Sequence, residues 1–289
     1  MAEKVFLNGS LIDLDEARVS VTDSGLLYGA GLFETMRVHH GVVFRLEDHL
    51  ERLSVSARTL SISYPYEKAR VRAAIDELIQ AHRLAEARVR LTLTNGPARA
   101  TQEQPAPTLL ITATEFRPYP EQSYQTGALV ILCPFRQNPT DPTCGHKTTS
   151  YYPRLLALNL ARRQQATEAL WFTTDERLAE GCVSNVFLVK DSILSTPRLD
   201  TPVLPGIARK TVCEVAQQQS LELAEKDLRR ADLLGADEVF LTNVIMEVLP
   251  VVRVEERTIG TGKVGPVTQR LREAFAQVVE QECKGQEGT

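Results

Sequence analysis

The spacing of apolar residues predicts a β-hairpin at the start of the chain. Residues 5–7 and 10–14 are rich in apolar side chains, and each run has the length of a short strand. Asn8-Gly9 separates them, and this pair tolerates the positive φ angles that a two-residue hairpin turn requires. We therefore expect two antiparallel strands here.

Apolar periodicity predicts a small α+β domain over residues 1–116. Apolar residues three and four positions apart place one stripe on a helix over 47–59 and another on a helix over 67–83. The apolar residues of 89–93 alternate with polar ones, as in a half-buried strand. Further apolar runs predict strands at 109–113 and 128–133.

The second half of the chain mixes helices and strands more evenly. Residues 117–127 contain Pro118 and Pro120, and we expect them to be a linker to a larger domain over 128–289. Strands are predicted at 168–173, 184–189 and 238–242. Helices are predicted over 154–165, after Pro205-Gly206, and along a final apolar stripe formed by Val264, Val267, Leu271, Phe275 and Val278.

The composition is that of an ordinary globular protein. Hydrophobic residues make up 43% and charged residues 24%, and the formal net charge of −4 provides no basic field for a polyanion. No apolar run approaches the roughly 20 residues that span a bilayer, and the first ten residues lack an apolar secretory core. We therefore expect a cytoplasmic protein that binds neither nucleic acid nor membranes.

The cysteines and histidines do not predict a disulfide framework or a metal site. The five cysteines are widely scattered without a C-x-x-C pair, and no H-E-x-x-H motif occurs. We therefore expect no metal. Only eight of the thirty-three basic residues are lysines, so few side chains could act as an amine nucleophile.

Lys147 is the first candidate for such chemistry. It lies in a hydroxyl-rich segment, 144–152, between predicted strands and a predicted helix. A lysine in a partly desolvated pocket can form a Schiff base as a neutral amine, whereas an ordinary lysine points into solvent. Its position alone does not decide between these interpretations.

Three other features are equally open when each is taken alone. Pro205-Gly206 precedes a predicted helix whose first N–H groups could bind a phosphate, although many ordinary helices begin this way. Glu180 precedes an apolar strand, where it could pair with a protonated heterocyclic nitrogen or lie in a solvated turn. Arg52 flanks the apolar stripe of the helix over 47–59 and could be a surface charge.

In this order the motifs resemble those of the class IV (fold type IV) pyridoxal-phosphate (PLP) enzymes. That family includes branched-chain aminotransferases, D-amino-acid aminotransferases and aminodeoxychorismate lyases. The resemblance covers nearly the whole chain, and it is strong because six weak motifs occur in register. These motifs are residues 28–35 (YGAGLFET), 49–53 (HLERL), Lys147, Glu180-Gly181 with 184–187 (SNVF), 204–207 (LPGI), and 241–243 (LTN) with Glu247 and Pro250.

The resemblance implies a fold and a set of roles. The fold would be a two-domain α+β/α/β structure, with a smaller N-terminal α/β domain and a larger C-terminal β-barrel-like domain surrounded by helices. Lys147 would hold PLP as a Schiff base and move the substrate proton, and Glu180 would keep the pyridine nitrogen protonated. The phosphate would be held by Arg52, the N–H groups of Ile207 and Ala208, and the turn of Thr242 and Asn243.

Some positions depart from the family pattern. Ala30 stands where relatives often carry an acid, and Ala208 and Val244 lack hydroxyl groups that could contact the phosphate. Phe33 and Asn95 replace a tyrosine and a carboxylate-binding arginine of familiar D-amino-acid aminotransferases, which makes that activity less favoured.

Among the reactions of the family we expect 4-amino-4-deoxychorismate lyase activity, which releases pyruvate and forms 4-aminobenzoate for folate synthesis. Residues 27–35, 196–201 and 242–247 resemble those of that lyase. The alternative is branched-chain aminotransferase activity, between Leu, Ile or Val and 2-oxoglutarate, because residues 204–207 and 265–270 resemble those enzymes. A further alternative is another class IV transamination, and a non-catalytic PLP-binding protein is an alternative of a different class.

The resemblance also suggests substrate contacts and an assembly. Tyr28, Phe33, Thr35 and Arg90 would face a small amino substrate. The candidates for binding its carboxylate are Arg37, Arg88, Arg90 and Arg99, each of which could instead be a solvated surface residue. A homodimer with active sites at the subunit interface is expected by resemblance.

Overall fold

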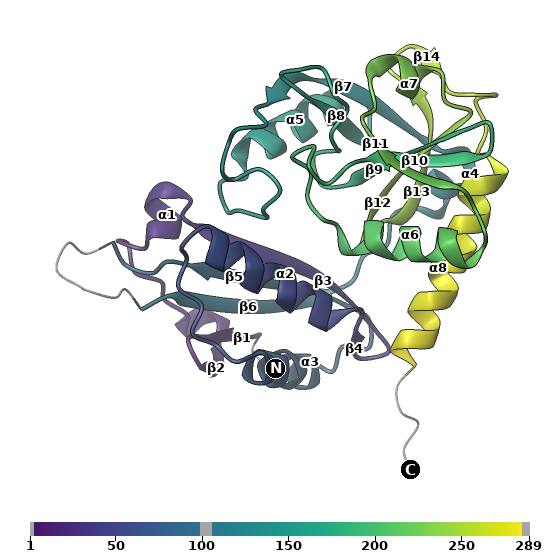
Figure 1. The fold of residues 1–289 in the computed structure, drawn as a ribbon. Helices are drawn as coiled ribbons and strands as arrows, with labels where there is room; N and C mark the ends of the chain where they lie inside the picture. Colours follow the sequence, from purple (N-terminus) through teal and green to yellow (C-terminus); the bar gives the residue numbers. More distant parts are fainter. Residues whose placement is uncertain (1–2, 99–105, 285–289) are drawn as a thin grey trace. The chain divides into compact units, whose positions relative to one another are not determined.

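The computed structural model describes residues 3–98 and 106–284, so Arg99 lies outside the described residues (Figure 1). The chain divides into two compact units. Unit 1 contains residues up to 117 together with 146–151 and the residues from 279 on, and unit 2 contains 118–145 and 152–278. The domain limits expected above, 1–116 and 128–289 around a linker, stay predictions.

Unit 1 is built on an antiparallel sheet with the strand order β2-β1-β6-β5-β3-β4. The predicted hairpin is confirmed, because Asn8 and Gly9 connect its strands with φ angles of 49° and 105°. The strands predicted at 89–93 and 109–113 are also present. The strands are β1 (Lys4–Leu7), β2 (Ser10–Asp13), β3 (Gly31–His39), β4 (Val42–Val43), β5 (Ala87–Thr94) and β6 (Thr108–Glu115).

Two long helices complete the hydrophobic core of unit 1. They are α2 (Leu46–Thr59) and α3 (Lys68–His82), which confirm the predicted helices within one residue at each end. Their apolar stripes, represented by Leu50 and Ile75, are fully buried with the sheet residues of one core. The short helix α1 (Ser24–Tyr28) precedes β3, and a 3-10 turn occupies Leu14–Glu16.

Unit 2 contains a mixed sheet with the order β11-β10-β9-β12-β13-β7-β8, and β14 pairs with β13 (Figure 1). The pairs β10–β11, β7–β8 and β7–β13 are parallel, and the others are antiparallel. The strands are β7 (Ala128–Gln137), β8 (Glu168–Thr173), β9 (Asn185–Lys190), β10 (Ile193–Pro197), β11 (Leu223–Lys226), β12 (Glu238–Asn243), β13 (Glu247–Val254) and β14 (Arg257–Thr258).

The three helices predicted in the second half of the chain are present, but the first of them begins and ends two residues earlier than the predicted 154–165, and two short helices were not predicted. Val264 was expected on the stripe of the final helix, but α8 begins at Pro266, which is favoured at the first helical position because it lacks an N–H group. The predicted linker segment contains the short helix α4. The helices are α4 (Glu121–Thr126), α5 (Tyr152–Arg163), α6 (Ile207–Gln218), α7 (Arg230–Leu234) and α8 (Pro266–Cys283).

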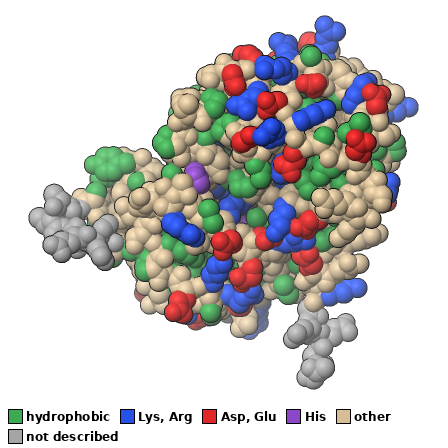
Figure 2. Space-filling model, in the orientation of Figure 1, with side chains coloured by type: hydrophobic (Ala, Val, Ile, Leu, Met, Phe, Trp, Pro, Cys, Tyr) green, Lys and Arg blue, Asp and Glu red, His purple; other side chains and the backbone are tan. Residues whose placement is uncertain are grey.

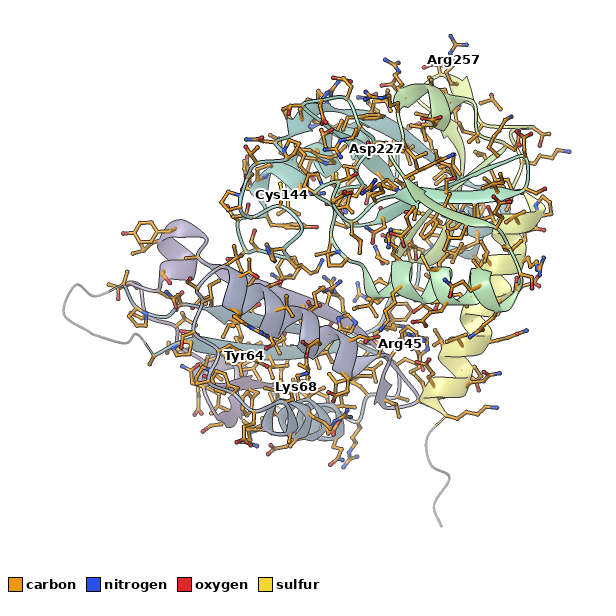
Figure 3. The ribbon with its side chains drawn as sticks, in the orientation of Figure 1. Arg45, Tyr64, Lys68, Cys144, Asp227 and Arg257 are labelled. Carbon is orange, nitrogen blue, oxygen red and sulfur yellow. The ribbon has the colours of Figure 1, made fainter. Side chains whose placement is uncertain are left out.

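Hydrogen bonds fix both ends of α8. In unit 2, the Glu238 carboxylate at the start of β12 accepts the N–H groups of Val267 and Thr268 at 3.1 and 2.7 Å, which caps the N-terminus of the helix. In unit 1, Arg45, labelled in Figure 3, donates two hydrogen bonds of 2.9 and 2.7 Å to Glu282 in the last turn.

The surface carries charges of both signs. Figure 2 shows Lys and Arg side chains interspersed with Asp and Glu over the visible face. Several of them form exposed ion pairs, such as Lys190 with Asp237 and Arg198 with Asp200. Among the helices of the described residues, none combines the length and the apolar character needed to cross a bilayer.

Candidate active site

Lys147 lies in unit 1 beside β3, although it is more than one hundred residues away from that strand in sequence. Its carbonyl accepts the Phe33 N–H at 2.8 Å, and Thr149 N–H donates to Gly31 O at 2.9 Å, so residues 147–149 extend the sheet for a short distance. This pairing is possible because the N-terminal end of β3 has a free edge beyond the short strand β4. The backbone of Lys147 is therefore held by the sheet.

The Lys147 amine lies against aromatic rings. Its Nζ atom is 4.6 Å from the centroid of the Phe33 ring and 5.8 Å from that of Tyr151, and the two rings meet edge to face at 5.1 Å. The lysine side chain is half-buried. Aromatic rings at this distance exclude water from part of the amine surface and restrict where the amine can lie.

Thr35 and Arg90 face the same side of the sheet as Phe33. Thr35 follows Phe33 by two positions in β3, and it is the register partner of Arg90 in β5. The Arg90 guanidinium lies 4.0 Å from the Phe33 ring centroid. Burial and the neighbouring charge of Arg88 lower the pKa of Arg90, while the coulombic interaction with Tyr151 raises it.

The other predicted substrate residues are placed less favourably. Arg37 forms an ion pair with Glu86 and its guanidinium lies over the Phe116 ring, so this side chain already has an anionic partner. Arg88 is exposed on β5. Tyr28, at the end of α1, has 72% of its surface exposed. Arg90 is therefore the best placed of the described arginines for a substrate carboxylate beside Phe33.

On the opposite side of β3, Glu34 is buried with two basic partners from α2. Arg52 donates to both Glu34 oxygens, through Nε at 2.9 Å and Nη2 at 2.5 Å. The His49 Nδ1 atom donates to Oε2 at 2.8 Å, and His49 Nε2 has no partner among the described residues. This three-residue cluster fixes Arg52, the residue predicted to bind phosphate.

The electrostatics of this cluster depend on burial. Burial raises the pKa of Glu34, but the charge of Arg52 and the hydrogen bond from His49 outweigh it, and the pKa falls from 4.5 to about 2. Burial lowers the pKa of His49 more strongly than the Glu34 hydrogen bond raises it. At neutral pH the cluster therefore holds an ionised carboxylate, a cationic arginine and a neutral histidine.

Glu180 belongs to unit 2, where both of its oxygens have hydrogen-bond donors. Arg154 of α5 donates through Nη2 to Oε1 at 2.6 Å, and the Leu204 N–H donates to Oε2 at 2.9 Å. The carboxylate is buried, with 5% of the residue exposed. The interpretation of Glu180 as a solvated turn residue is thus excluded.

A second buried carboxylate shapes the loop that follows Glu180. Glu168 in β8 is fully buried and accepts the N–H groups of Cys182 and Val183, each at 2.9 Å, and the Ser184 hydroxyl at 3.0 Å. A Cβ at Gly181 would collide with Ser184 and crowd Glu168, so the loop requires glycine there. Burial raises the pKa of Glu168.

The N-terminus of α6 has the features of a phosphate site. No side chain caps this end, and its first residues are Ile207 and Ala208, as predicted. A Cβ at Gly206 would collide with Asn185 Oδ1, so glycine allows the backbone to pass close to β9. Asn185 in turn donates to Leu204 O at 2.9 Å, which ties this segment to the strand.

The other predicted phosphate residues lie in the neighbouring strand β12. Thr242 is the register partner of Asn185; it is fully buried, and its hydroxyl has no hydrogen-bond partner among the described residues. Such an oxygen is expected to have a partner in the working protein. The Asn243 side chain is used within the fold, because it donates to Val183 O and accepts the N–H groups of Ile245 and Met246.

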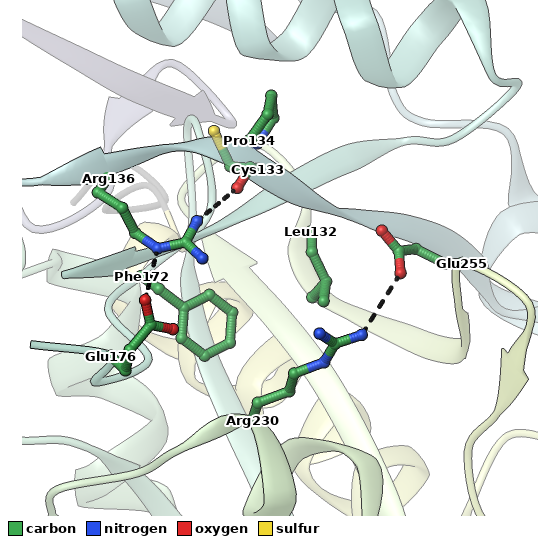
Figure 4. Close-up of a pocket in the computed structure, with 8 residues that line it drawn as sticks. All are labelled: Leu132, Cys133, Pro134, Arg136, Phe172, Glu176, Arg230 and Glu255. Atoms are coloured by element: carbon green, nitrogen blue, oxygen red, sulfur yellow. Dashed lines mark hydrogen bonds and ion pairs between the residues drawn. The ribbon is translucent and has the colours of Figure 1, made fainter. Parts of the chain in front are cut away.

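A separate cavity of unit 2 has a different character. It occupies about 420 Å³ beside the irregular pairing of β7 with β8, and it contains the pairs Arg136–Glu176 and Arg230–Glu255 (Figure 4). None of its described lining residues is a predicted site residue. Because its arginines are already paired with carboxylates, it lacks the unpaired polar groups expected of a cofactor site.

Comparison with known proteins identifies a family and relatives that the chain resembles over most of its length. A model of the family described as amino-transferase class IV matches residues 31–254. The chain is 33% identical to a protein of Methanocaldococcus jannaschii assigned as a branched-chain-amino-acid aminotransferase, with 95% of this chain and 96% of the relative covered. It is 30% identical to a D-alanine aminotransferase of Listeria monocytogenes, with 97% of both chains covered.

Two further similarities are informative. An aminodeoxychorismate lyase of Bacillus subtilis is 30% identical, over 93% of this chain and 92% of the lyase. The branched-chain amino acid aminotransferase of Escherichia coli superposes with a TM-score of 0.92 at 28% identity, covering 100% of this chain and 98% of that one. Another branched-chain aminotransferase with the same TM-score and identity was solved with pyridoxamine 5'-phosphate.

The pKa shift of Glu34 predicts a loss of stability in acid. Its folded pKa lies below the unfolded value, so its contribution is complete above pH 4.5 and disappears as the pH falls toward 2. We expect the free energy of unfolding to fall by about 3 kcal/mol over this range from Glu34 alone. Urea unfolding of the wild type and Glu34→Gln at several pH values measures this, because the variant lacks that component.

Glu77→Gln on the exposed face of α3 is the matched control, and it should follow the wild-type curve. A Glu34→Gln variant whose acid sensitivity equals that of the wild type would show that the buried cluster does not govern stability at low pH.

Proposed function

Because this chain belongs to the class IV aminotransferase family, we propose that its Lys147 forms the Schiff base with PLP and that the chain acts on a small amino substrate. The observation that carries this proposal is the half-buried Lys147 amine beside the Phe33 and Tyr151 rings. The same strand holds Glu34, which orients Arg52. Residues of three family motifs therefore contact one another through strand β3.

The residues of the chain fit the cofactor. The unpartnered Thr242 hydroxyl, the uncapped N-terminus of α6 and the close passage at Gly206 suit a phosphate group in unit 2. By resemblance to the family, we assign Arg52 to phosphate binding and Glu180 to the ring nitrogen. When bound, PLP supplies an electron sink that stabilises negative charge at the substrate carbon next to the amino group.

The residues of the chain perform the remaining steps. Lys147 takes the proton from the carbon that bears the substrate amino group, and the aromatic rings around it limit its hydration. Arg90 binds a substrate carboxylate, because it is partly buried and faces the same side of the sheet as Phe33.

Within the family we propose pyruvate elimination from 4-amino-4-deoxychorismate. The argument rests on Thr35, which is opposite Arg90 in the sheet register and so places a hydroxyl on the same face of the sheet as the arginine that we assign to the carboxylate of the leaving group. Lys147 removes the proton from the carbon that bears the amino group, and the bond between the ring carbon and the enolpyruvyl oxygen breaks. The proton taken by Lys147 then passes through the Thr35 hydroxyl to the departing oxygen. The protonated enol then becomes pyruvate, and the ring becomes aromatic.

Branched-chain transamination is the second candidate. The observations that favour it are the 33% identity to the Methanocaldococcus jannaschii protein and the TM-score of 0.92 with the Escherichia coli aminotransferase. In this reaction Lys147 would return the proton to a different carbon, and no leaving group would need an acid.

We also propose that two copies of the chain associate through the surface around α1. Five large apolar side chains are exposed on or near this helix, and the most exposed are Val21 at 79%, Leu26 at 68% and Tyr28 at 72%. Apolar side chains grouped on a surface commonly mark an interface, and dimers are expected for this family.

Cofactor binding through Lys147 should be visible. The purified wild type with PLP should show the visible absorbance of a lysine Schiff base, and Lys147→Ala should lose that band and its turnover. The control Lys190→Ala removes an exposed lysine of unit 2 and should retain both. A wild type that stays colourless with excess PLP would refute the assignment, and a yellow protein without turnover on any amino donor would indicate a cofactor carrier.

The reaction is identified by its products. We expect 4-aminobenzoate and pyruvate from 4-amino-4-deoxychorismate, and Thr35→Val should lower kcat about 100-fold while Thr35→Ser retains most of it. Leucine or D-alanine with 2-oxoglutarate provides the competing assays, which measure glutamate. Glutamate formed from leucine without any 4-aminobenzoate would replace the lyase assignment by branched-chain transamination.

The association of two copies can be tested by light scattering over a range of protein concentrations. We expect the mass of a dimer, and Leu26→Glu should weaken the dimer by about tenfold or more, because it places a charge in an apolar contact. Val55→Glu changes an exposed apolar residue of α2 and is the matched control. A monomeric wild type at micromolar concentration would contradict the proposal.

A further inference from the structure

Arg154 makes a set of contacts that the proposed function does not use. From α5, its Nη2 atom donates to Glu180 Oε1 at 2.6 Å, and its Nη1 atom donates to the Gly181 carbonyl at 2.8 Å. Its guanidinium carbon lies 5.1 Å from the centroid of the Trp171 ring. These three contacts fix the plane of the guanidinium against the acid that we assign to the ring nitrogen.

The Glu180 carboxylate is correspondingly constrained. Leu204 N–H holds one oxygen and Arg154 holds the other, so the group cannot rotate freely. A carboxylate next to a ring nitrogen favours the protonated ring, because the opposite charges attract. The cationic Arg154, which is paired with that carboxylate, cancels part of this attraction.

We propose that Arg154 is a positioning residue that orients Glu180 and shares its negative charge, so that the ring nitrogen of a bound cofactor is held less tightly protonated than by a lone carboxylate. This inference rests on the role assigned to Glu180 in the proposed function. Protonation of the ring nitrogen matters because a protonated cofactor ring withdraws electrons more strongly than a neutral one. Arg154 thereby influences which of the possible reactions the site favours.

The test measures the proton on the ring nitrogen directly. The holoenzyme is loaded with PLP labelled with nitrogen-15 in its ring, and the chemical shift of that nitrogen is followed with pH by NMR. We expect Arg154→Gln to raise the apparent pKa of the ring nitrogen by about one unit, a tenfold change in its protonation equilibrium. Arg154→Lys retains the charge and should stay near the wild type.

A matched control comes from a similar arginine on β7. Arg136 also pairs with a glutamate, Glu176, and its guanidinium lies 5.9 Å from the Phe172 ring centroid, but it has no contact with Glu180 among those described. Arg136→Gln should therefore leave the nitrogen signal unchanged. Melting temperature and bound PLP per chain are recorded for each variant, and Arg154→Lys provides the comparison if Arg154→Gln loads poorly.

Glu180→Gln separates the possible failures. If the wild type and Glu180→Gln give the same ring-nitrogen signal, the role assigned to Glu180 in the proposed function is wrong. If those two differ but loaded Arg154→Gln has an unchanged or lower pKa, the charge-sharing role of Arg154 is overturned while the proposed function stands. An upward shift in Arg154→Lys equal to that in Arg154→Gln would also overturn it, because the charge is retained there.

Discussion

The buried negative charge of Glu34 is the constraint on which unit 1 depends. An ionised carboxylate that is removed from water without partners costs several kcal/mol, so a fold that buries it must bring basic groups to it. Arg52 and His49 meet this requirement from two successive turns of α2. As a result, the packing of α2 on β3 and the orientation of Arg52 are set by the same interaction, and a residue assigned to cofactor binding is oriented before any ligand arrives.

The sequence predicts those helices and strands that bury one face and expose the other. The helices α2 and α3 show clear apolar stripes, and the alternation in β5 marks one half-buried face. No strand is predicted over Gly31–His39, although β3 lies inside the sheet of unit 1. It is buried on both faces and includes Glu34 and Arg37, so neither alternation nor an apolar run is visible. The periodicity of apolar residues therefore does not predict β3, the strand that contains Phe33, Glu34 and Thr35.

The sequence likewise points to some residues of the candidate site and not to others. Lys147 and Glu180 can be proposed as site residues from the sequence because family motifs surround them. Nothing in the sequence marks Arg154 or Glu168 as the residues that organise the loop after Glu180. Their roles depend on side-chain contacts between segments 14 to 27 positions apart, such as the pairs Arg154–Glu180 and Glu168–Ser184. A lone sequence contains no signal for such a pairing, because any of its many arginines and glutamates could form one.

The strand-like pairing of residues 147–149 with β3 has a consequence for the nascent chain. During synthesis, β3 and the helices α2 and α3 are made long before Lys147. The edge of β3 that pairs with residues 147–149 therefore stays unpaired until those residues are made. The two paired segments are more than one hundred residues apart in sequence, and such non-local contacts form slowly. The Lys147 amine therefore reaches its final environment only after much of the polypeptide has been synthesised.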